Sequence, residues 1–450
     1  MTTTNPRLRR VAALWDSPRL QDEHLVARLW LASRLLVLVE WAAMLFTLGD
    51  TRYYFEKISK MSELGPQATM VEYPTPVLWL LELPNLLASG HRWVYVVTFF
   101  LLMFLLDAAF SRSLWRHGGR LRGQAMAFWI AFVPLVGTTS YLRFDILTAV
   151  LAGWALLLAG RRRPAWAGAL IGIGAAVKLW PALLWPALMG SRRPEDRATA
   201  RWRSTLGFWG AGGALALVSL WWAGWDRLLS PLGWQGERGL QIESVWAGLP
   251  MIHRLVQPHE FWIAVSDFNA WEISGPGTDL LLTCTSVATV LGILTVVLAY
   301  VVWLRRPVQR PVEAAALMML LVLVMIVTNK TFSPQYLIWL GGPLAAAWVM
   351  AGLTIEADDA DRDNQATLLQ VSTLTLCVSL LTQLVYPIGY ASLVGHRPGM
   401  VLATVVLLVR NIALVVLLVT VVRWCWRLLT ASAPSSPTSH SSASDAEVPR

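Results

Sequence analysis

The sequence predicts an all-α polytopic membrane protein with about 12 transmembrane segments. Of its 450 residues, 56% are hydrophobic and only 14% are charged, whereas soluble domains carry about 25% charged residues. Apolar stretches of about 20 residues, the length of a membrane-crossing helix, recur along the whole chain. These observations exclude a water-soluble globule, a disordered chain, a collagen-like protein and a disulfide-rich scaffold.

Each apolar stretch is expected to form a helix. In order, the stretches are 27–47, 93–110, 123–137, 145–160, 165–190, 204–224, 279–304, 312–328, 335–353, 367–386 and 399–422. The fifth differs from the others because Lys178-Leu179-Trp180-Pro181 interrupts it and arginine clusters flank both of its ends. It is therefore a candidate for a hairpin of two short helices.

The distribution of basic residues predicts the orientation, since Lys and Arg are enriched in cytosolic loops. With a hairpin at 165–190, the cytosolic loops hold 23 Lys and Arg residues and the opposite side holds 10. With a single span there, 12 of the 23 would move to the other side. The hairpin is therefore expected, and it places both termini in the cytosol.

This topology divides the chain into three parts. Residues 1–26 are expected to be a cytosolic segment without a cleavable signal pattern, and residues 27–424 form the transmembrane domain. Residues 425–450, which end in a stretch rich in Ser, Ala and Pro, are expected to be a disordered cytosolic tail. Two large loops, 48–92 and 225–278, are expected on the external side.

Several other classes of site find no support. The net charge of +9 does not indicate nucleic-acid binding, because 33 of the 37 basic residues are Arg and they lie between apolar segments. The three cysteines all lie in apolar segments and give no disulfide framework. His253 and His259 share a loop but lack a carboxylate–histidine pattern, so neither a metal site nor a cofactor is predicted.

Asp50 is the candidate general base, because it follows the first apolar segment directly. A carboxylate at that position can face a lipid-borne substrate and remain partly solvated. The alternative is an ordinary interfacial acid or a helix cap. Tyr53 and Tyr54 follow closely and are candidate substrate contacts, although tyrosine is also common at membrane interfaces.

Three cations are candidates for holding a phosphate. Lys330 and Arg143 lie at the external ends of apolar segments, and Lys178 lies at the tip of the expected hairpin. A cation there would offset the charge of a phosphate leaving group. The alternative for Arg143 is a structural pair with Asp145.

The second external loop contains a candidate sugar-binding group. Gln241 and Glu243 lie near Trp246, and planar hydrogen-bonding groups beside an aromatic ring suit a sugar; a capped loop helix is the alternative. A further three ionisable residues lie within apolar segments, where each costs about 2.5–3.5 kcal/mol on insertion scales, and pairing between helices is expected for them. They are Arg34, Glu40 and Asp107.

Six short stretches, in order over about residues 25 to 345, resemble a known family. They are Gly49 to Tyr54, Glu72-Tyr73-Pro74, Tyr141 to Asp145, Lys178 to Pro181, Gln241 to Trp246, and Lys330 to Tyr336. The chain resembles the polytopic GT-C glycosyltransferases, and in particular the actinobacterial glycosyltransferase family 87 of polyprenyl-phosphate-mannose-dependent α-mannosyltransferases. The resemblance implies a GT-C-like fold, an essential aspartate at Asp50, and substrate contacts from Glu72, Tyr73, Asp145 and Gln335.

The resemblance implies inverting transfer of a mannosyl residue from a polyprenyl-phosphate sugar to a glycolipid or lipoglycan acceptor, at the external face of the plasma membrane. It implies no obligatory metal, because the leaving group is a monophosphate. The bilayer and the two lipid-linked substrates are then the partners. Two alternatives stay open: an arabinofuranosyltransferase of the same family, and a lipid or sugar transporter, which would also fit twelve spans and a broken hairpin.

Overall fold

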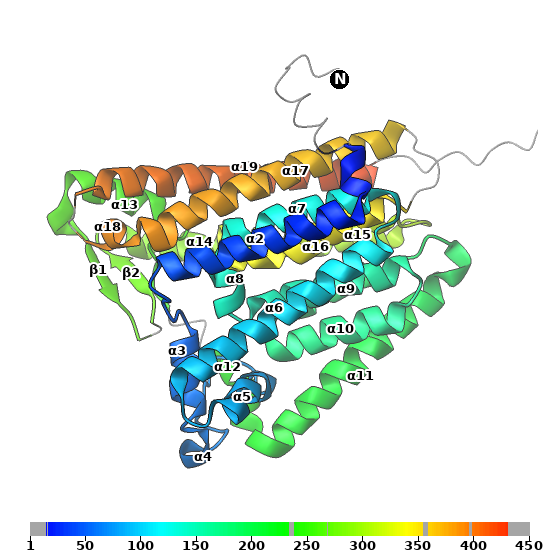
Figure 1. Ribbon diagram of the computed structural model, residues 1–450. Coiled ribbons are helices and arrows are strands. Elements are labelled where there is room, and N and C mark those ends of the chain that lie inside the picture. Colours follow the sequence, from blue (N-terminus) through cyan, green and yellow to red (C-terminus); the bar gives the residue numbers. More distant parts are fainter. Residues whose placement is uncertain are drawn as a thin grey trace, which may run out of the picture.

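A computed structural model describes Trp15 and residues 17–233, 238–267, 269–353, 359–395 and 398–430. These residues form one helical body whose long helices run between two ends (Figure 1). One end, here called the basic end, carries the segments 161–163, 191–203 and 305–310. The other, here called the loop end, carries most of the residues of 48–91 and 238–277.

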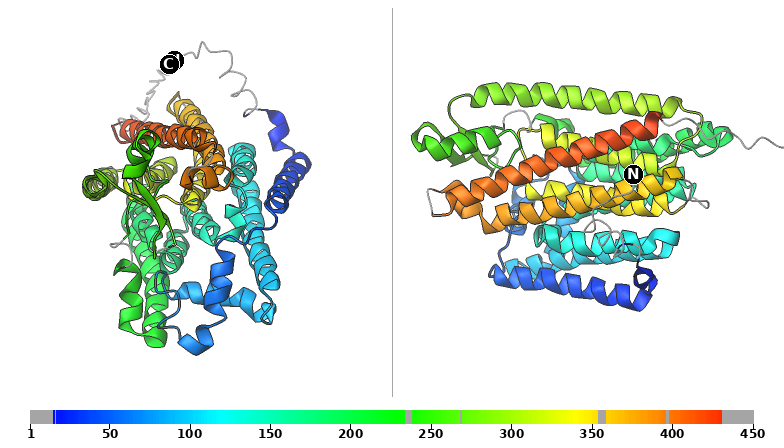
Figure 2. Two further views of the ribbon diagram at one scale, coloured as in Figure 1. Left: turned by 90° about the vertical axis from the view of Figure 1, so that its left-hand side faces the viewer. Right: turned by 90° about the horizontal axis from the view of Figure 1, so that it is seen from above.

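Six stretches of helix in the described residues are long and apolar enough to cross a membrane. They are Arg92–His117 (α6), Pro194–Ala223 (η4 and α11), Thr278–Arg305 (α14), Pro311–Thr328 (α15), Arg362–Ile388 (most of α17, with η7) and Met400–Thr430 (α19). In Figure 2, α17 and α19 lie side by side along the body. This finding agrees with an α-helical membrane protein.

Five further expected segments are helical but are not among the six helices that are long and apolar enough to cross a membrane. They are Glu23–Ala43 (α2), Arg122–Val136 (α7), Asp145–Gly160 (α9), Pro164–Val177 (α10) and Ile338–Ala351 (α16). Except for α2, these helices have 14 to 16 residues, shorter than the about 20 residues that span a bilayer upright. Twelve membrane segments therefore stay a prediction.

The core is formed by α9, α15 and α16. Every residue of α16 is buried, and so are most residues of α15. Gly342 in α16 lies against α9 so closely that a Cβ there would come within 1.8 Å of the Ala149 carbonyl oxygen. Only glycine permits this approach of the two helix backbones.

The segment 164–190 leaves the basic end and returns to it. Helix α10 ends at Val177, and the chain continues from Trp180 to Met189 as the 3₁₀-helix η3. Pro164 and Gly190 line the same cavity at the basic end, so the chain reverses between them. The second arm is a 3₁₀-helix and not an α-helix, and Pro186 within it removes a backbone donor that an α-helix would use.

The two long loops are folded into short elements. Residues 48–92 contain Thr51–Ile58 (α3), Met61–Leu64 (α4) and Pro76–Ala88 (α5). Residues 225–278 contain Trp225–Gly233 (α12), Gly248–Val256 (α13), Pro258–Glu260 (η5), Trp262–Val265 (β1) and Trp271–Ser274 (β2). The strands pair antiparallel, with Trp262 opposite Ser274 and Val265 opposite Trp271, so the all-α prediction missed this small sheet.

Short elements also connect the long helices. They are Pro18–Gln21 (η1), Gly119–Leu121 (η2), Thr139–Leu142 (α8), Pro194–Asp196 (η4), Pro334–Leu337 (η6), Leu384–Ile388 (η7) and Tyr390–Val394 (α18). Three of them lie at the loop end: α8 leads into α9, η6 leads into α16, and η7 follows α17. Their positions matter because the candidate functional site lies there.

The interhelical pairing predicted for Arg34 and Asp107 is confirmed. Nη2 of Arg34 in α2 lies 2.8 Å from Oδ1 of Asp107 in α6, and both side chains are buried. Trp129 and Tyr141 also donate to the Asp107 carboxylate, at 2.6 and 2.7 Å. A buried charge is tolerated when it is paired and hydrogen-bonded in this way.

The ends of the chain differ from the predicted boundaries. Helix α2 already begins at Glu23, where the side chain of Asp22 accepts hydrogen bonds from the first backbone N–H groups. Helix α19 continues to Thr430, so residues 425–430 are helical and are not part of a disordered tail. The predictions for residues 1–14, 16 and 431–450 lie outside the described residues.

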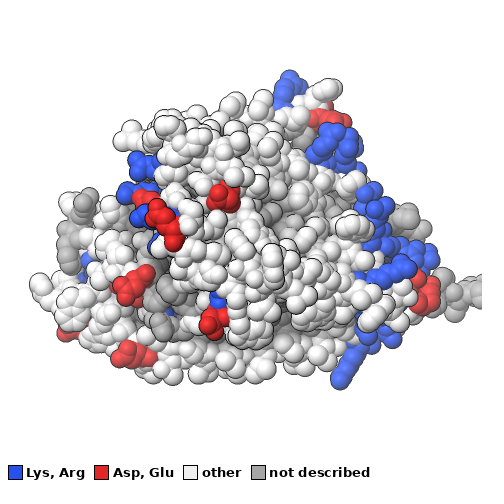
Figure 3. All heavy atoms as spheres, turned by 90° about the horizontal axis from the view of Figure 1, so that it is seen from below, with Lys and Arg blue, Asp and Glu red and all other residues white. Residues whose placement is uncertain are grey.

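Charge is distributed unequally over the surface. On the face drawn in Figure 3, basic side chains gather at the right-hand end, and most acidic side chains lie toward the left. Between the two ends the surface is almost free of charged groups on this face. Such a band is what an apolar bilayer core requires.

Candidate functional site

A cavity of about 340 Å³ opens at the loop end. Its walls come from many parts of the chain, among them the start of α3, the junction of α8 and α9, the junction of α10 and η3, and η7. Nine of the thirteen predicted site residues line it: Asp50, Tyr53, Glu72, Tyr73, Arg143, Lys178, Gln241, Glu243 and Gln335. Residues that are far apart in the sequence thus meet in one cavity.

Asp50 and Arg143 form an ion pair in this cavity. Oδ2 of Asp50 contacts Nη1 of Arg143, and the two side chains are 21% and 17% exposed. Asp50 precedes α3, but its side chain makes no capping hydrogen bond to that helix. The helix-cap alternative is therefore wrong, and the carboxylate instead remains at the cavity wall.

The surroundings set the proton affinity of Asp50. Burial raises the pKa of this carboxyl, and the Arg143 guanidinium acts in the opposite direction. Asp50 in turn raises the pKa of Arg143, against the effect of burial, so the guanidinium stays charged. The result is a partly accessible carboxylate with an increased proton affinity.

Lys178 and Asp145 form a second ion pair next to the first. Nζ of Lys178 lies 2.6 Å from Oδ1 of Asp145, and Nε1 of Trp339 donates to the same oxygen at 2.6 Å. The alternative that Arg143 pairs with Asp145 is wrong, because Lys178 occupies that position. Asp145 itself is 2% exposed and does not line the cavity.

Aromatic rings surround the Lys178 ammonium group. Its Nζ lies 5.4 Å from the ring centroid of Phe144 and 5.1 Å from that of Trp339. Ring faces attract a cation at such distances. They hold Lys178 at the cavity wall, where it is 17% exposed.

Tyr53 and Glu72 connect the two parts of the first long loop. The Tyr53 hydroxyl donates to Oε1 of Glu72 at 2.6 Å. Behind them, the guanidinium of Arg227 donates to four backbone carbonyls, those of Pro66, Thr69, Met70 and Tyr73. A single buried arginine from α12 thus fixes the loop that carries Glu72 and Tyr73.

Gln241 and Glu243 line the opposite wall. The Gln241 side chain accepts a hydrogen bond from the Phe332 backbone N–H at 2.6 Å and donates to Oε2 of Glu243 at 3.3 Å. Burial raises the pKa of Glu243 to about 7, although Arg410 opposes the shift. Oε1 of Glu243 is buried and makes no hydrogen bond among the described residues, and the Tyr390 hydroxyl acts on the same carboxyl to lower its pKa.

Four predicted residues lie outside the lining. Tyr54 is buried between Phe99 and Phe144, and Asp145 lies behind Lys178. The indole of Trp246 donates to the Val327 carbonyl at 3.1 Å. The backbone carbonyl of Lys330 accepts from the Gln241 N–H at 3.1 Å, while its side chain lies among groups that include Glu272 and Arg238.

Several lining residues were not among the predicted site residues. They are Arg238, Asp267, Asn269, Ala270, Trp271, Ser333, Pro334, Tyr336, Tyr386 and Tyr390. A signal existed for Tyr386, because it ends the apolar segment 367–386 on the same predicted side as Asp50. No such signal marked Trp271, which reaches the cavity through the pairing of β1 and β2.

The cavity combines three kinds of group. It has a carboxylate suited to accept a proton, cations suited to hold an anion, and a buried carboxylate beside aromatic rings. Within the described ranges, no group of three or more His, Cys, Asp and Glu side chains is arranged to hold a metal ion.

Comparison with known proteins gives one match. The family model of glycosyltransferase family 87 matches residues 72–334, more than half of the chain. The matched range includes lining residues from Glu72 to Pro334, whereas Asp50, Tyr53, Tyr386 and Tyr390 lie outside it. No curated protein and no solved structure matches the chain.

Proposed function

The chain belongs to glycosyltransferase family 87, and from this premise we propose that it transfers a mannosyl residue from a polyprenyl-phosphate sugar to a glycolipid or lipoglycan acceptor. The observation that carries the proposal is the cavity at the loop end, whose lining brings the Asp50 carboxylate together with the cations of Arg143 and Lys178. Transfer of a glycosyl group needs a proton acceptor for the attacking hydroxyl and a stabilised leaving group. The cavity offers both.

Asp50 is the proposed general base. The acceptor oxygen attacks the anomeric carbon as the bond from that carbon to the phosphate oxygen breaks, and Asp50 receives the hydroxyl proton. One displacement inverts the configuration, so a β-linked donor gives an α-linked product. Burial favours this role because it raises the pKa of Asp50, and its 21% exposure leaves room for the acceptor.

Arg143 and Lys178 are the proposed holders of the donor phosphate. The leaving phosphate departs with the bonding electron pair and needs no general acid, unlike the sugar oxygen in glycoside hydrolysis. Arg143 and Lys178 both line the cavity that holds Asp50. Lys330 was also predicted for this role, but because its side chain is not part of the lining, we propose that it acts through Gln241.

The remaining lining residues are proposed to bind the sugars. Glu243 and Gln241 on one wall and Tyr53 and Glu72 on the other offer planar acceptors and hydroxyls for sugar hydroxyl groups. Trp271 replaces Trp246 as the proposed stacking partner, since it lies in the lining. Tyr73 and Gln335 complete this proposed set.

The loop end is proposed to face outward from the plasma membrane. This proposal rests on the basic end, whose arginines fit the cytosolic side by the enrichment of Lys and Arg there. A lipid-linked donor would then enter the cavity laterally from the outer leaflet. The sugar could also be arabinofuranose, because the family resemblance covers both branches.

The test compares transfer by the unmodified protein and by Asp50→Asn. Membranes containing each protein are incubated with a labelled polyprenyl-phosphate mannose and a mannosylated glycolipid acceptor. A parallel series uses the arabinose donor. We expect transfer of mannose by the unmodified protein and a loss of about 10²-fold or more in Asp50→Asn, the usual contribution of a general base.

Asp279→Asn is the matched control, because Asp279 lies at the same end in α14 but outside the cavity. It should transfer at the unmodified rate. Equal transfer by Asp50→Asn would remove Asp50 as the base. If the arabinose donor alone reacts, the mannosyl proposal fails, and if neither donor reacts, the polyprenyl-phosphate proposal fails.

A further inference from the structure

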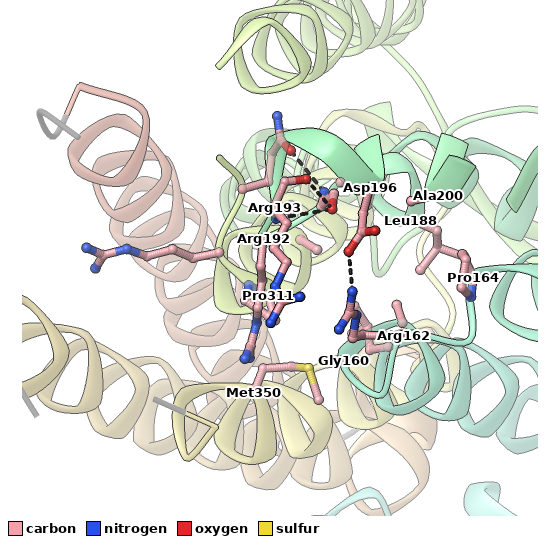
Figure 4. Close-up of a pocket in the computed structure, with 18 of the residues that line it drawn as sticks. Gly160, Arg162, Pro164, Leu188, Arg192, Arg193, Asp196, Ala200, Pro311 and Met350 are labelled. Carbon is pink, nitrogen blue, oxygen red and sulfur yellow. Dashed lines mark hydrogen bonds and ion pairs between the residues drawn. The ribbon is translucent and has the colours of Figure 1, made fainter. Parts of the chain in front are cut away.

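A second cavity, of about 390 Å³, opens at the basic end. It lies between the start of α10, the end of η3, the start of α11 and the start of α15 (Figure 4). The proposed transfer reaction makes no use of it, since the first cavity lies at the opposite end of the helical body. Its lining residues therefore need a separate explanation.

The lining is strongly cationic. Five arginines, Arg162, Arg192, Arg193, Arg203 and Arg310, face a single acid, Asp196. Asp196 already forms an ion pair with Arg162, as Figure 4 shows. The other four arginines form no ion pair among the residues that the structure describes.

Glu313, a buried acid that precedes the lining residue Ala314, is also engaged. Oε1 of Glu313 accepts from Nη1 of Arg306 at 2.9 Å, and Oε2 accepts from the indole of Trp303 at 2.8 Å. The Arg310 backbone N–H donates to Oε2 as well, at 2.8 Å. Glu313 therefore binds groups at the start of α15, and it does not compensate the charges of the four arginines that form no ion pair in the described part of the chain.

Buried hydrogen bonds hold the walls in place. Gln309 is 2% exposed, and its side chain accepts from the Ser191 backbone N–H at 2.9 Å while it donates to the Arg306 carbonyl at 2.6 Å. The Gln309 backbone N–H donates to the Ser191 carbonyl at 2.9 Å. The segment with Arg192 and Arg193 is thus joined to the segment with Arg310, and the backbone that carries these exposed or half-buried arginines is held in place.

Apolar groups lie directly beside the cations. Leu156, Leu188, Trp303 and Met350 line the inner part of the cavity. Outside it, Trp166 and Trp202 at the starts of α10 and α11 are each 63% exposed. Exposed tryptophans of this kind lie at the level of lipid headgroups, so the cavity opens where a headgroup would be.

We propose that this cavity binds the phosphate headgroup of an anionic phospholipid, with its acyl chains against the neighbouring apolar surface. Arginine binds phosphate through paired N–H groups, and basic pockets between transmembrane helices on the cytosolic side bind anionic headgroups. The apolar inner wall favours a lipid over a free anion. The bound lipid would tie η3, α11 and α15 together at the basic end.

The test uses the full chain, purified and delipidated in a neutral detergent. Its melting temperature is followed as phosphatidylglycerol, phosphatidylcholine or inorganic phosphate is added, and retained lipids are counted by native mass spectrometry. The test variant is Arg192→Gln with Arg203→Gln. The control is Arg112→Gln with Arg116→Gln, which removes the same charge from α6 outside the cavity.

We expect phosphatidylglycerol to raise the melting temperature and phosphatidylcholine to leave it unchanged. The apparent affinity should fall roughly thirtyfold in the test variant, from about fivefold for each guanidinium near an anionic lipid surface, and should persist in the control. Equal losses in the two variants would overturn the proposal in favour of general surface attraction. If inorganic phosphate raised the melting temperature as much as phosphatidylglycerol, the bound phosphate would be a free anion and not a lipid headgroup. If no additive raised the melting temperature, the cavity would not be a binding site.

Discussion

Nζ of Lys178 lies 2.6 Å from Oδ1 of Asp145, and this contact ties the reversal between α10 and η3 to the first residue of α9. Because Asp145 is 2% exposed, its carboxylate is stabilised by Lys178 and by the indole of Trp339 and not by water. The pair therefore has a structural effect as well as a place at the cavity wall.

Lys178→Met should destabilise the protein by about 3 kcal/mol, since removing one partner leaves a buried charge uncompensated. The free energy of unfolding is measured in mild detergent by denaturant titration. Lys178→Met combined with Asp145→Asn should recover most of the loss, because the neutral amide can still accept from Trp339. If Lys178→Met left the free energy of unfolding unchanged, the contact between Lys178 and Asp145 would not stabilise the protein.

The ion pair of Asp50 and Arg143 gives a prediction about pH. Burial raises the pKa of Asp50 and Arg143 opposes this, so Arg143→Gln should raise that pKa further. A base acts in its deprotonated form, and the acid limb of kcat/KM should therefore move to higher pH, by about one unit for the loss of one nearby cation.

The measurement is the pH profile of transfer with each variant. Arg52→Gln serves as the control, since Arg52 is 63% exposed and pairs with Glu56 outside the cavity. Its profile should match that of the unmodified protein. A limb that stayed in place or moved to lower pH in Arg143→Gln would contradict the assignment of Asp50 as the titrating base.

Most of the residues that line the cavity could be predicted from the sequence, but the ion pairs that they form could not. Positions such as Asp50, Arg143 and Lys178 stood out because charged residues at the ends of apolar segments need an explanation. Which acid pairs with which cation depends on how α8, α9 and η3 pack. For that reason Arg143 pairs with Asp50, although Asp145 is only two residues away in the chain.

Trp246 and Trp271 show why the stacking residue could not be predicted from the sequence. Both lie in the second long loop, and the sequence favoured Trp246 because it is near Gln241 and Glu243. The structure turns the Trp246 indole to the Val327 carbonyl, while the β-hairpin brings Trp271 to the cavity. Pairing of two four-residue strands gives too weak a sequence pattern to be recognised in an otherwise helical chain.

Glu243 gives a prediction about stability. Burial raises its pKa to about 7 in the folded protein, compared with about 4.3 in an unfolded chain. Between these values the unfolded chain has released the proton and the folded protein still holds it, so stability falls as pH rises. The loss should reach about 3 kcal/mol near pH 7 and then level off.

Glu243→Gln removes this titration and should reduce the slope between about pH 4.3 and pH 7, leaving the part that Asp50 contributes, because burial raises its pKa as well. Melting temperatures are compared across that range for the unmodified protein, Glu243→Gln and Glu63→Gln, where Glu63 is exposed in α4. The last variant should retain the original slope. A slope as steep in Glu243→Gln as in the unmodified protein would assign the titration to other groups.

The proposed orientation can be tested with single cysteines at the two ends. Glu63 is exposed in α4 at the loop end, and Arg112 is exposed in α6 toward the basic end. Cys377 is exposed and Cys284 half-buried, so both are replaced by alanine before either single cysteine is introduced.

Glu63→Cys should react with a membrane-impermeant maleimide in intact cells, and Arg112→Cys only after permeabilisation. This expectation follows from the band nearly free of charge between the two ends on the face drawn in Figure 3, since a bilayer core around that band would separate them. The reverse labelling pattern would place the proposed catalytic cavity on the cytosolic side and the arginine-lined cavity on the external side, and the proposal of transfer at the external face would then be wrong.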